Sequence, residues 1–346
     1  MKRRRRVLLL CHEDLVPPPD LKGYSEGEIL AFRTEYDVAW ALRELGHEVR
    51  ILGVSDDLIP IRECVAEFDP HVIFNLLMEF RDVGSFMVHV VSYFELLGVP
   101  YTGCNPQGLT LARNKALAKK ILRYHRIPTP AFLLFRLGRP ARAPRGLSFP
   151  MIVKSVDEDA SVGVSQASVV RDEEALRERV EFVHRNVGTH AIAEEYIEGR
   201  EITMGILGNR RLETFPAWEM RFDKLPEGTL PIATERAKWS PAYQKRLGID
   251  TEPAKLSDAL ATRIQRLARR CYRALELSGY ARLDLRLGAD ERIHVIEANP
   301  NPDLSLDEDF AASARLAGLE YPALAQRIVN LGISYRPPWS LDEPGR

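Results

Sequence analysis

Two neighbouring segments near the end of the sequence carry side chains that could bind a metal ion. Residues 280–287 and 293–299 alternate apolar and polar side chains, and the short link 288–291 predicts a β-hairpin between them. The first strand then places three charged side chains on the face opposite its apolar ones: Arg282, Asp284 and Arg286. The second strand places Glu297 and Asn299 on one shared face.

Oxygen ligands of this kind suit Mg²⁺, which keeps several waters and is bound by a few carboxylates together with substrate phosphates. Asp284, Glu297 and Asn299 are therefore candidate ligands for Mg²⁺, with Mn²⁺ as an alternative ion. The other interpretation of the same pattern is a salt-bridged strand face that binds nothing.

Three lysines could supply positive charge for phosphate groups. Lys154 ends the apolar run 149–154, where a buried stem can aim a single ammonium group. Lys115 stands at a helix start, and Lys238 stands in a polar segment. Neither GxGxxG nor GxxxxGK[ST] occurs in the sequence, so phosphates must be held in another way.

The N-terminal part of the chain alternates strands and helices, which predicts a parallel sheet. The expected strands are 7–10, 48–54 and 70–75, and the expected helices are 26–45 and 85–97. This first α/β domain would span residues 1–105.

A smaller α+β domain is expected over residues 106–196. Its expected elements are a helix at 109–125, a helix capped by Asp172, and strands at 131–135, 151–154, 166–170 and 190–196. A third domain over 197–335 would begin with a strand at 201–207 and carry an amphipathic helix at 256–277 before the hairpin. Residues 216–240 show no readable pattern, and 336–346 form a tail.

Composition narrows the class of protein and its partners. The 48 Lys+Arg against 49 Asp+Glu give a net charge of −1, so a nucleic-acid partner is not expected. The four cysteines are widely spaced with no CxxC pair, which fits reduced thiols and a cytoplasmic protein. The apolar stretch after the N-terminal arginines ends at Leu10, too early for a signal peptide, and no membrane span is expected.

A series of short motifs between about residues 70 and 330 resembles one family. The motifs in chain order are Tyr101-Thr102-Gly103, Asn114-Lys115, Ile152-Val153-Lys154, Ser161-Val162-Gly163, residues 194–201 (EEYIEGRE), Lys238-Trp239, Arg282-Leu283-Asp284 and Glu297-Ala298-Asn299-Pro300. Together they look like the ATP-grasp ligases, and most like the D-alanine–D-alanine ligase branch. The resemblance implies three domains: a parallel α/β domain, a small central α+β domain and an α+β domain with a mostly antiparallel sheet. It also implies ATP between the last two domains and a homodimer through the first.

The resemblance assigns a role to each matching residue. Lys115 and Lys154 match the lysines on the α and β phosphates, Ser161 matches an ATP-binding residue, and Lys238 matches the lysine on the γ phosphate. Glu194, Glu195, Tyr196 and Ile197 match the strand that reads adenine, and Glu201 matches the ribose-binding acid. Asp284, Glu297 and Asn299 match the Mg²⁺ ligands, and Arg282 matches the arginine that stabilises the transferring group.

The sequence departs from this family where the substrates should bind. Residues 75–84 lack the family's histidine, and the loop 155–160 is acidic instead of rich in glycine and serine. Asp307, Glu308 and Asp309 lie where the related ligases place a serine for the acceptor's carboxylate. These acids favour a cationic or carboxylate-blocked acceptor. The candidate substrate contacts are Glu28, Asp303 and Glu308, and the alternative is that the acids only cap the helix 310–316.

The function expected from these residues is ATP-dependent ligation of a small-molecule carboxylate to an amine. The carboxylate would take the γ phosphoryl group to form an acyl phosphate, which the amine attacks. The alternatives are an authentic D-alanine–D-alanine ligase, an ATP-grasp phosphotransferase, and a nucleotide-binding scaffold without turnover.

Overall fold

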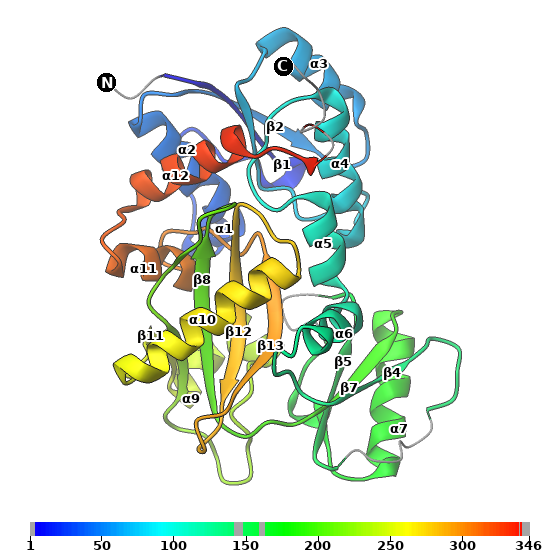
Figure 1. Cartoon of the computed structure of the whole chain (residues 1–346). Helices are drawn as coiled ribbons and strands as arrows, with labels where there is room; N and C mark the ends of the chain where they lie inside the picture. The colour runs from blue at the N-terminus through cyan, green and yellow to red at the C-terminus, as the bar shows by residue number, and fades with distance from the viewer. Residues whose placement is uncertain (1–3, 142–147, 159–162, 339, 341–346) are drawn as a thin grey trace.

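The computed structural model of the protein describes residues 4–141, 148–158, 163–338 and 340, and it contains three β-sheets that follow one another along the chain (Figure 1). The expected three-part mixture of a parallel sheet, antiparallel sheets and helices is confirmed.

The first sheet is parallel, with β1 at its centre in the order β2-β1-β3. Its strands are β1 (Arg6–His12), β2 (Glu48–Val54) and β3 (Val72–Asn75), and its helices are α1 (Glu26–Ala31), α2 (Arg33–Glu44), α3 (Ile59–Phe68) and α4 (Met87–Leu97). The single helix expected over 26–45 is wrong, because the backbone breaks at Phe32 (φ −115°, ψ 19°). The pattern also gave no sign of α3.

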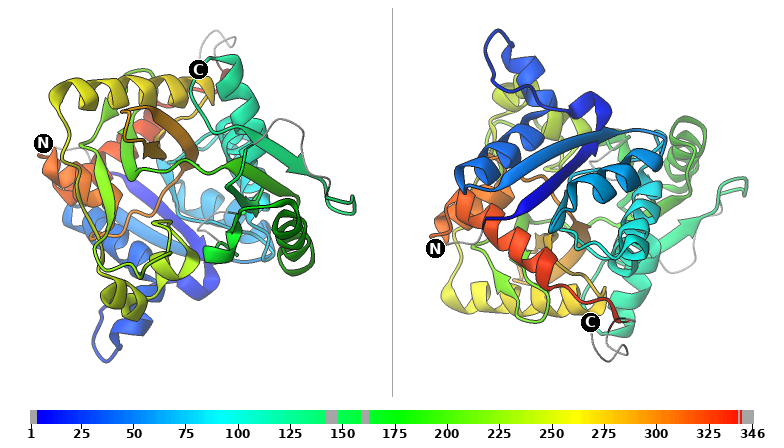
Figure 2. Two further views of the ribbon diagram at one scale, coloured as in Figure 1. Left: turned by 90° about the horizontal axis from the view of Figure 1, so that it is seen from below. Right: turned by 90° about the horizontal axis from the view of Figure 1, so that it is seen from above.

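Strand β1 is buried on both faces, as a central parallel strand must be. Leu8 and Leu10 pack with residues of α3 and α4, whereas Val7 and Leu9 pack with α2 and with α12 (Tyr321–Ser334). The last helix of the chain therefore completes the core of the first sheet, and Figure 2 shows it beside the blue strands.

The second sheet is antiparallel in the order β4-β7-β5-β6. Its strands are β4 (Phe132–Phe135), β5 (Met151–Ser155), β6 (Val169–Val170) and β7 (Ala191–Glu195). The helices in this part of the chain are α5 (Pro106–Arg113), α6 (Lys115–Tyr124) and α7 (Glu173–Phe182). The continuous helix expected over 109–125 is wrong, since Asn114 ends α5 and its side chain caps α6 by accepting from Leu117 N. The strand expected at 166–170 is mostly a 3₁₀ turn, Gln166–Ser168.

The third sheet is antiparallel in the order β11-β10-β8-β12-β13, with β9 paired to β8. Its strands are β8 (Arg200–Leu207), β9 (Glu213–Thr214), β10 (Trp218–Phe222), β11 (Ile249–Pro253), β12 (Tyr280–Leu287) and β13 (Ile293–Pro300). The predicted hairpin is β12 and β13. The unreadable segment 216–240 holds β10 and α8 (Glu235–Trp239), and α9 (Pro241–Leu247) follows it.

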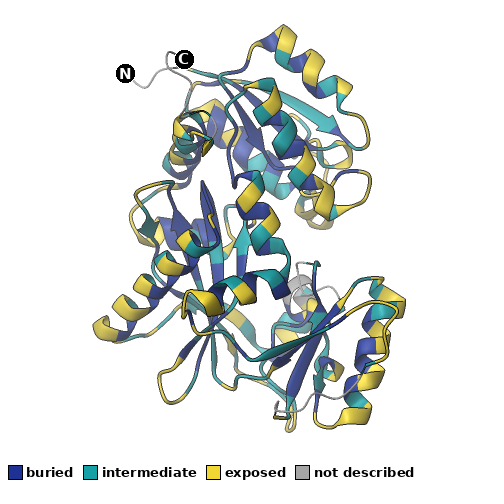
Figure 3. Ribbon diagram, turned by 45° about the vertical axis from the view of Figure 1, so that its right-hand side comes forward, coloured by how far each residue is buried: buried dark blue, intermediate teal, exposed yellow. Residues whose placement is uncertain are grey.

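Two helices cover opposite faces of this third sheet. Helix α10 (Asp258–Ala274) packs its apolar side on Ile202, Met204 and Ile206, and its outer side is exposed (Figure 3). Helix α11 (Asp309–Leu316) packs Phe310 against Gly205 and Phe215 on the other face. The charged face of β12 thus lies on the side of α11, while its apolar side chains face α10. The domain bounds stay a prediction.

Candidate active site

The hairpin β12–β13 brings the expected polar side chains into register. Asp284 lies opposite Glu297, and Arg282 lies opposite Asn299. Arg282 donates from Nε and Nη2 to the two carboxylate oxygens of Asp284 at 2.8 and 3.0 Å, and Asn299 Nδ2 donates to Asp284 Oδ2 at 3.0 Å. Asp284 is therefore the centre of a half-buried group of oxygen and nitrogen atoms.

A β-bulge interrupts the hairpin beside this group. The register changes after Asp284, so that β13 has one extra residue, Ile296, between the partners of Asp284 and Leu285. Thr129 donates to the carbonyl of Val295 at 2.8 Å, and Lys119 donates to the carbonyl of Ile296 at 2.9 Å. Side chains from the part of the chain that precedes β4 thus donate hydrogen bonds to the backbone carbonyls at the bulge.

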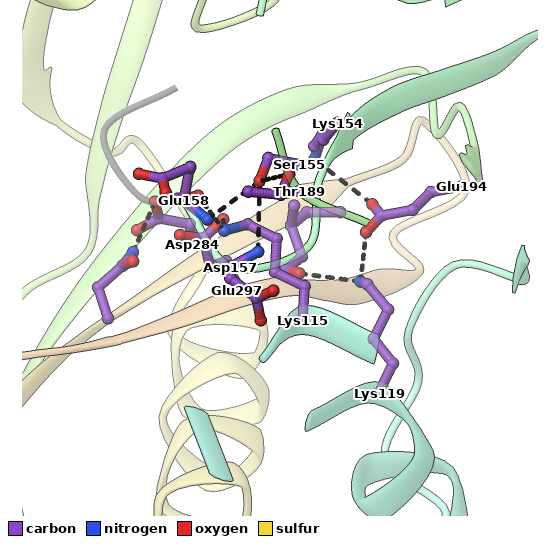
Figure 4. A network of polar contacts seen from close by, with 12 residues as sticks. Lys115, Lys119, Lys154, Ser155, Asp157, Glu158, Thr189, Glu194, Asp284 and Glu297 are labelled. Carbon is purple, nitrogen blue, oxygen red and sulfur yellow. Dashed lines mark hydrogen bonds and ion pairs between the residues drawn. The ribbon is translucent and has the colours of Figure 1, made fainter. Parts of the chain in front are cut away.

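Lys119 belongs to a buried ionic network that lies between β5, β7 and α6 (Figure 4). The carboxylate of Glu194 is 3.3 Å from Lys119 Nζ and 3.4 Å from Lys154 Nζ, and Lys119 and Glu194 are each 1% exposed. Burial alone would raise the pKa of Glu194, but the two ammonium groups lower it below its ordinary value. Glu194 is therefore held as a carboxylate.

Lys115 is placed by the N-terminus of α6. Its Nζ donates to the carbonyl oxygen of Glu158 at 2.6 Å and is 3.7 Å from Glu297 Oε2. The neighbouring Asn114 donates to Asp157 Oδ1 at 2.8 Å, which ties the acidic loop after β5 to the start of the same helix. One buried lysine thus connects the second sheet to the hairpin of the third.

A cleft between the second and third sheets is lined by many of the residues described above. Its polar lining residues are Lys115, Lys154, Ser155, Glu158, Glu194, Glu195, Tyr196, Glu201, Asp284, Arg286 and Glu297, and its apolar lining residues are Ile152, Val164, Ile197, Ile232, Ala233, Leu285 and Ile296. Glu201 forms an ion pair with Arg286 at 2.9 Å. Apolar walls beside lysines and carboxylates can hold a flat, partly apolar ring next to charged phosphates.

Most of the predicted ATP and metal residues therefore meet in one place. Arg282 and Asn299 join the cleft through their bonds to Asp284. Ser161 lies outside the described residues, and so does the side chain of Lys238, whose backbone belongs to α8.

The three candidate substrate residues are not in the cleft lining. Glu28 is exposed and forms a capping box with Ser25 at the start of α1, a structural role that explains its position without a ligand. Asp303 and Glu308 lie in the connection between β13 and α11.

Sequence reasoning missed Lys119 and Ser155. Lys119 lies four residues after Lys115, so the two share one face of α6, and this spacing was the available signal. Ser155 Oγ contacts Thr189 Oγ1 at 2.8 Å and accepts from the backbone N–H of Glu158 at 3.2 Å, which shapes the loop after β5.

Comparison with known proteins gives consistent results. The family model described as the D-ala D-ala ligase C-terminus matches residues 122–330. An uncharacterized protein of Sinorhizobium fredii is 33% identical over 85% of both chains. A D-alanine–D-alanine ligase of Desulforudis audaxviator is 30% identical over 89% of this chain and 95% of its own.

The fold is also shared with a solved structure. The crystal structure of the D-alanine–D-alanine ligase of Bacillus anthracis complexed with ATP superposes with a TM-score of 0.74, covers 95% of this chain and 97% of its own, and is 23% identical. In the described part of the protein, no helix combines the length and apolarity needed to cross a bilayer.

Proposed function

Because the chain belongs to the D-alanine–D-alanine ligase family of ATP-dependent carboxylate–amine ligases, we propose that it forms an amide through an acyl phosphate made in the cleft between the second and third sheets. The observation that carries this proposal is the convergence of Lys115, Lys154, Asp284 and Glu297 on one cleft.

The proposed nucleotide contacts come mostly from residues that line the cleft. Adenine would lie against the strand end Glu194–Ile197, and Glu201 would bind the ribose. The ammonium groups of Lys115 and Lys154 would bind the α and β phosphates, with Ser161 beside them and Lys238 at the γ phosphate. Glu194 would help to position Lys154, because its carboxylate forms an ion pair with the Lys154 ammonium group.

Mg²⁺ fits the chemistry of the hairpin residues. Asp284 and Glu297 offer carboxylate oxygens from directly opposed positions, and Asn299 adds an amide group bonded to Asp284. Asp284, Glu297 and Asn299 would hold the ion, which supplies charge neutralisation for the phosphates when bound. Mn²⁺ prefers the same oxygen ligands and could replace it.

The protein's own residues would position the reactants and spread charge. The substrate carboxylate attacks the γ phosphorus and ADP leaves, with Arg282 and Lys238 beside the transferring group. The amine nitrogen then attacks the acyl carbon, and the bond between the acyl carbon and the phosphate oxygen breaks. The amine loses one proton, and the leaving phosphate takes up that proton and departs as hydrogen phosphate. The step needs no covalent enzyme intermediate.

The test is ADP release from the purified protein with a panel of amino acids and amines that includes D-alanine, followed by product masses. We expect ADP and an amide in equal amounts, and Glu297→Gln should abolish both while circular dichroism stays unchanged. Glu291→Gln, at the exposed turn of the same hairpin, is the matched control and should keep full activity. A stable phosphorylated product without an amide would identify a phosphotransferase instead.

The oligomeric state and the cellular location are two further proposals, and each is tested by its own measurement. Light scattering on the purified protein tests the homodimer that the family resemblance implies. Fractionation of the source cells tests the cytoplasmic location expected from four buried free thiols.

A further inference from the structure

Carboxylates from three elements gather around the connection between β13 and α11. Asp303, Asp307 and Glu308 are exposed in this connection, Asp309 begins α11, and Glu35 and Asp37 lie on the adjacent α2. Hydrogen bonds hold the connection against α2: Thr34 donates to Asp303 Oδ1 at 2.7 Å, its hydroxyl also contacts that of Ser305 at 2.7 Å, and the N–H of Leu306 donates to Asp37 Oδ2 at 2.9 Å. We call these six residues the acidic group.

A capping hydrogen bond does not account for the position of Glu308. Glu308 occupies the N-cap position of α11, yet its side chain makes no capping hydrogen bond. Asp309 instead accepts from Thr203 Oγ1 at 3.5 Å. The hydrogen bonds to Asp303 given by Thr34 and Ser305 all reach Oδ1, and no hydrogen bond from the described residues to its Oδ2 accompanies them.

Two buried oxygen atoms at the acidic group have no hydrogen-bond partner among the described residues. They are Oε2 of Glu35, which is 4% exposed, and the hydroxyl of Tyr321, which is 6% exposed. The charges of Asp37, Asp303 and Glu35 all act on the Tyr321 hydroxyl. An unpaired buried oxygen costs free energy that a ligand bearing N–H donors would recover.

The positive charges near the acidic group do not neutralise it. Arg33 is shared between Asp37 at 4.0 Å and Asp307 at 3.4 Å, and Arg282 is bound through two nitrogens to Asp284. Burial, followed by Asp303, Asp309 and Asp307, raises the pKa of Glu308 to about 7 against the opposing effect of Arg282. Glu308 is exposed, so a ligand can reach its carboxylate from solvent.

The acidic group adjoins the reacting end of the cleft. Thr203, which donates to Asp309, lies opposite Asp284 in the pairing of β8 with β12. The charge of Arg282 acts on both Asp309 and Glu308. A molecule held at Glu308 would therefore extend toward Asp284 and Glu297.

We propose that the acidic group, with Glu308 and Asp303 exposed and with Glu35 buried beside the neighbouring Tyr321, binds a cationic group of the amine acceptor. This inference rests on the proposed ligase function and names its substrate class: a diamine or a guanidino-amine without a neighbouring carboxylate. One end of the acceptor is held as a cation, and the other end, as a neutral amine, attacks the acyl phosphate. A zwitterionic amino acid is disfavoured, because its carboxylate would face several acids.

Binding to the wild-type protein tests the inference without turnover. Calorimetric titration compares three ligands of similar length: 1,5-diaminopentane, 1-aminopentane and 5-aminopentanoate. We expect the diamine to bind at least about tenfold more tightly than 5-aminopentanoate, and its affinity to fall with rising salt. Equal binding of these two ligands, or no binding of the diamine, would overturn the proposal.

Substitutions locate the binding site. Glu308→Gln should weaken diamine binding at least about tenfold, while Glu63→Gln, an exposed acid on α3, should leave it unchanged. An unchanged diamine affinity in Glu308→Gln would refute the placement. ATP binding, measured separately on wild type and Glu297→Gln, distinguishes failure of the ligase assignment from failure of the acceptor site.

Discussion

The buried Lys154–Glu194–Lys119 network fixes the position of a lysine in the proposed phosphate site. Lys154 is 15% exposed and its ammonium group is held by Glu194, so its position is set before any nucleotide arrives. A flexible surface lysine would lose more conformational freedom on binding the same phosphate.

Lys154→Met keeps the apolar stem and removes the charge. We expect the free energy of ATP binding to weaken by about 1.5 to 3 kcal/mol, the range for hydrogen bonds to charged groups. Calorimetry measures the change. Lys120→Met, on the exposed side of α6, should bind ATP as wild type does. If Lys154→Met also binds ATP normally, the phosphate site has been misplaced.

Glu35 makes stability depend on pH. Burial raises its pKa to about 7 from an ordinary 4.5. The unfolded chain therefore loses this proton at lower pH than the folded chain, so the acid lowers stability as pH rises from 4.5 to 7, by about 3 kcal/mol in full. Glu35→Gln should raise the melting temperature at pH 8 and leave it unchanged near pH 4.5. A variant that is destabilised at pH 8 would contradict this account.

At the residue scale, the sequence predicted contacts that a regular pattern determines. The facing of Asp284 and Glu297 follows from strand periodicity and a short turn. The spacing of Lys119 from Lys115 indicates a shared helix face but not burial, because a lysine in an amphipathic helix is expected in solvent and the partner Glu194 is far away in sequence. Only the packing of α6 against the second sheet brings them together.

Among the secondary structure elements, the bulged strand β13 and helix α6 depend on each other. Lys119 on α6 donates a hydrogen bond to the carbonyl of Ile296 and forms an ion pair with the buried carboxylate of Glu194. Removing its charge leaves the Ile296 carbonyl without this donor and the buried Glu194 carboxylate without this counter-charge.

Lys119→Met should therefore lower the free energy of unfolding by about 3 kcal/mol, at the low end for a broken buried ion pair because Lys154 still contacts Glu194. Urea denaturation followed by circular dichroism measures the loss. The double variant Lys119→Met/Glu194→Gln should recover part of it, since the unpaired buried charge is then gone. Wild-type stability of the single variant would show that the network contributes nothing.

The boundaries of several helices depend on individual residues whose effect does not appear in the hydrophobic pattern. The apolar periodicity continues through Phe32 and Asn114, so one helix was expected at each place, although two form. At Asn114 the signal was present, because an asparagine that accepts from the third following N–H is a helix cap. Helix α3 is only ten residues long, and its proline at the start resembles a loop residue in sequence.

At the scale of the whole molecule, α12 packs so closely beside the first sheet that the addition of a single methyl group should disturb the contact. A Cβ atom at Gly332 would lie 2.5 Å from the carbonyl oxygen of Tyr101. Gly332→Ala should therefore lower the free energy of unfolding by about 1 to 3 kcal/mol through overpacking. Gly27→Ala, where nothing lies within 4 Å, is the control and should be neutral or stabilising. Thermal melts of both variants decide the matter.

The packing of α12 also sets an order of events during synthesis. The strands β1 to β3 leave the ribosome early, but the side chains that cover Val7, Leu9 and Phe74 include Leu324 and Ile328, which are made near the end. At about 5–20 residues per second, the interval between Asn75 and Tyr321 lasts on the order of tens of seconds. During this interval α2 can cover only part of this apolar face of the first sheet, and the part that α12 covers stays exposed, so a chaperone is expected to bind the growing chain there. Ribosome-bound chains that end before Tyr321 should therefore be protease-sensitive over β1–β3, and chains that extend well beyond Ser334 should be protected.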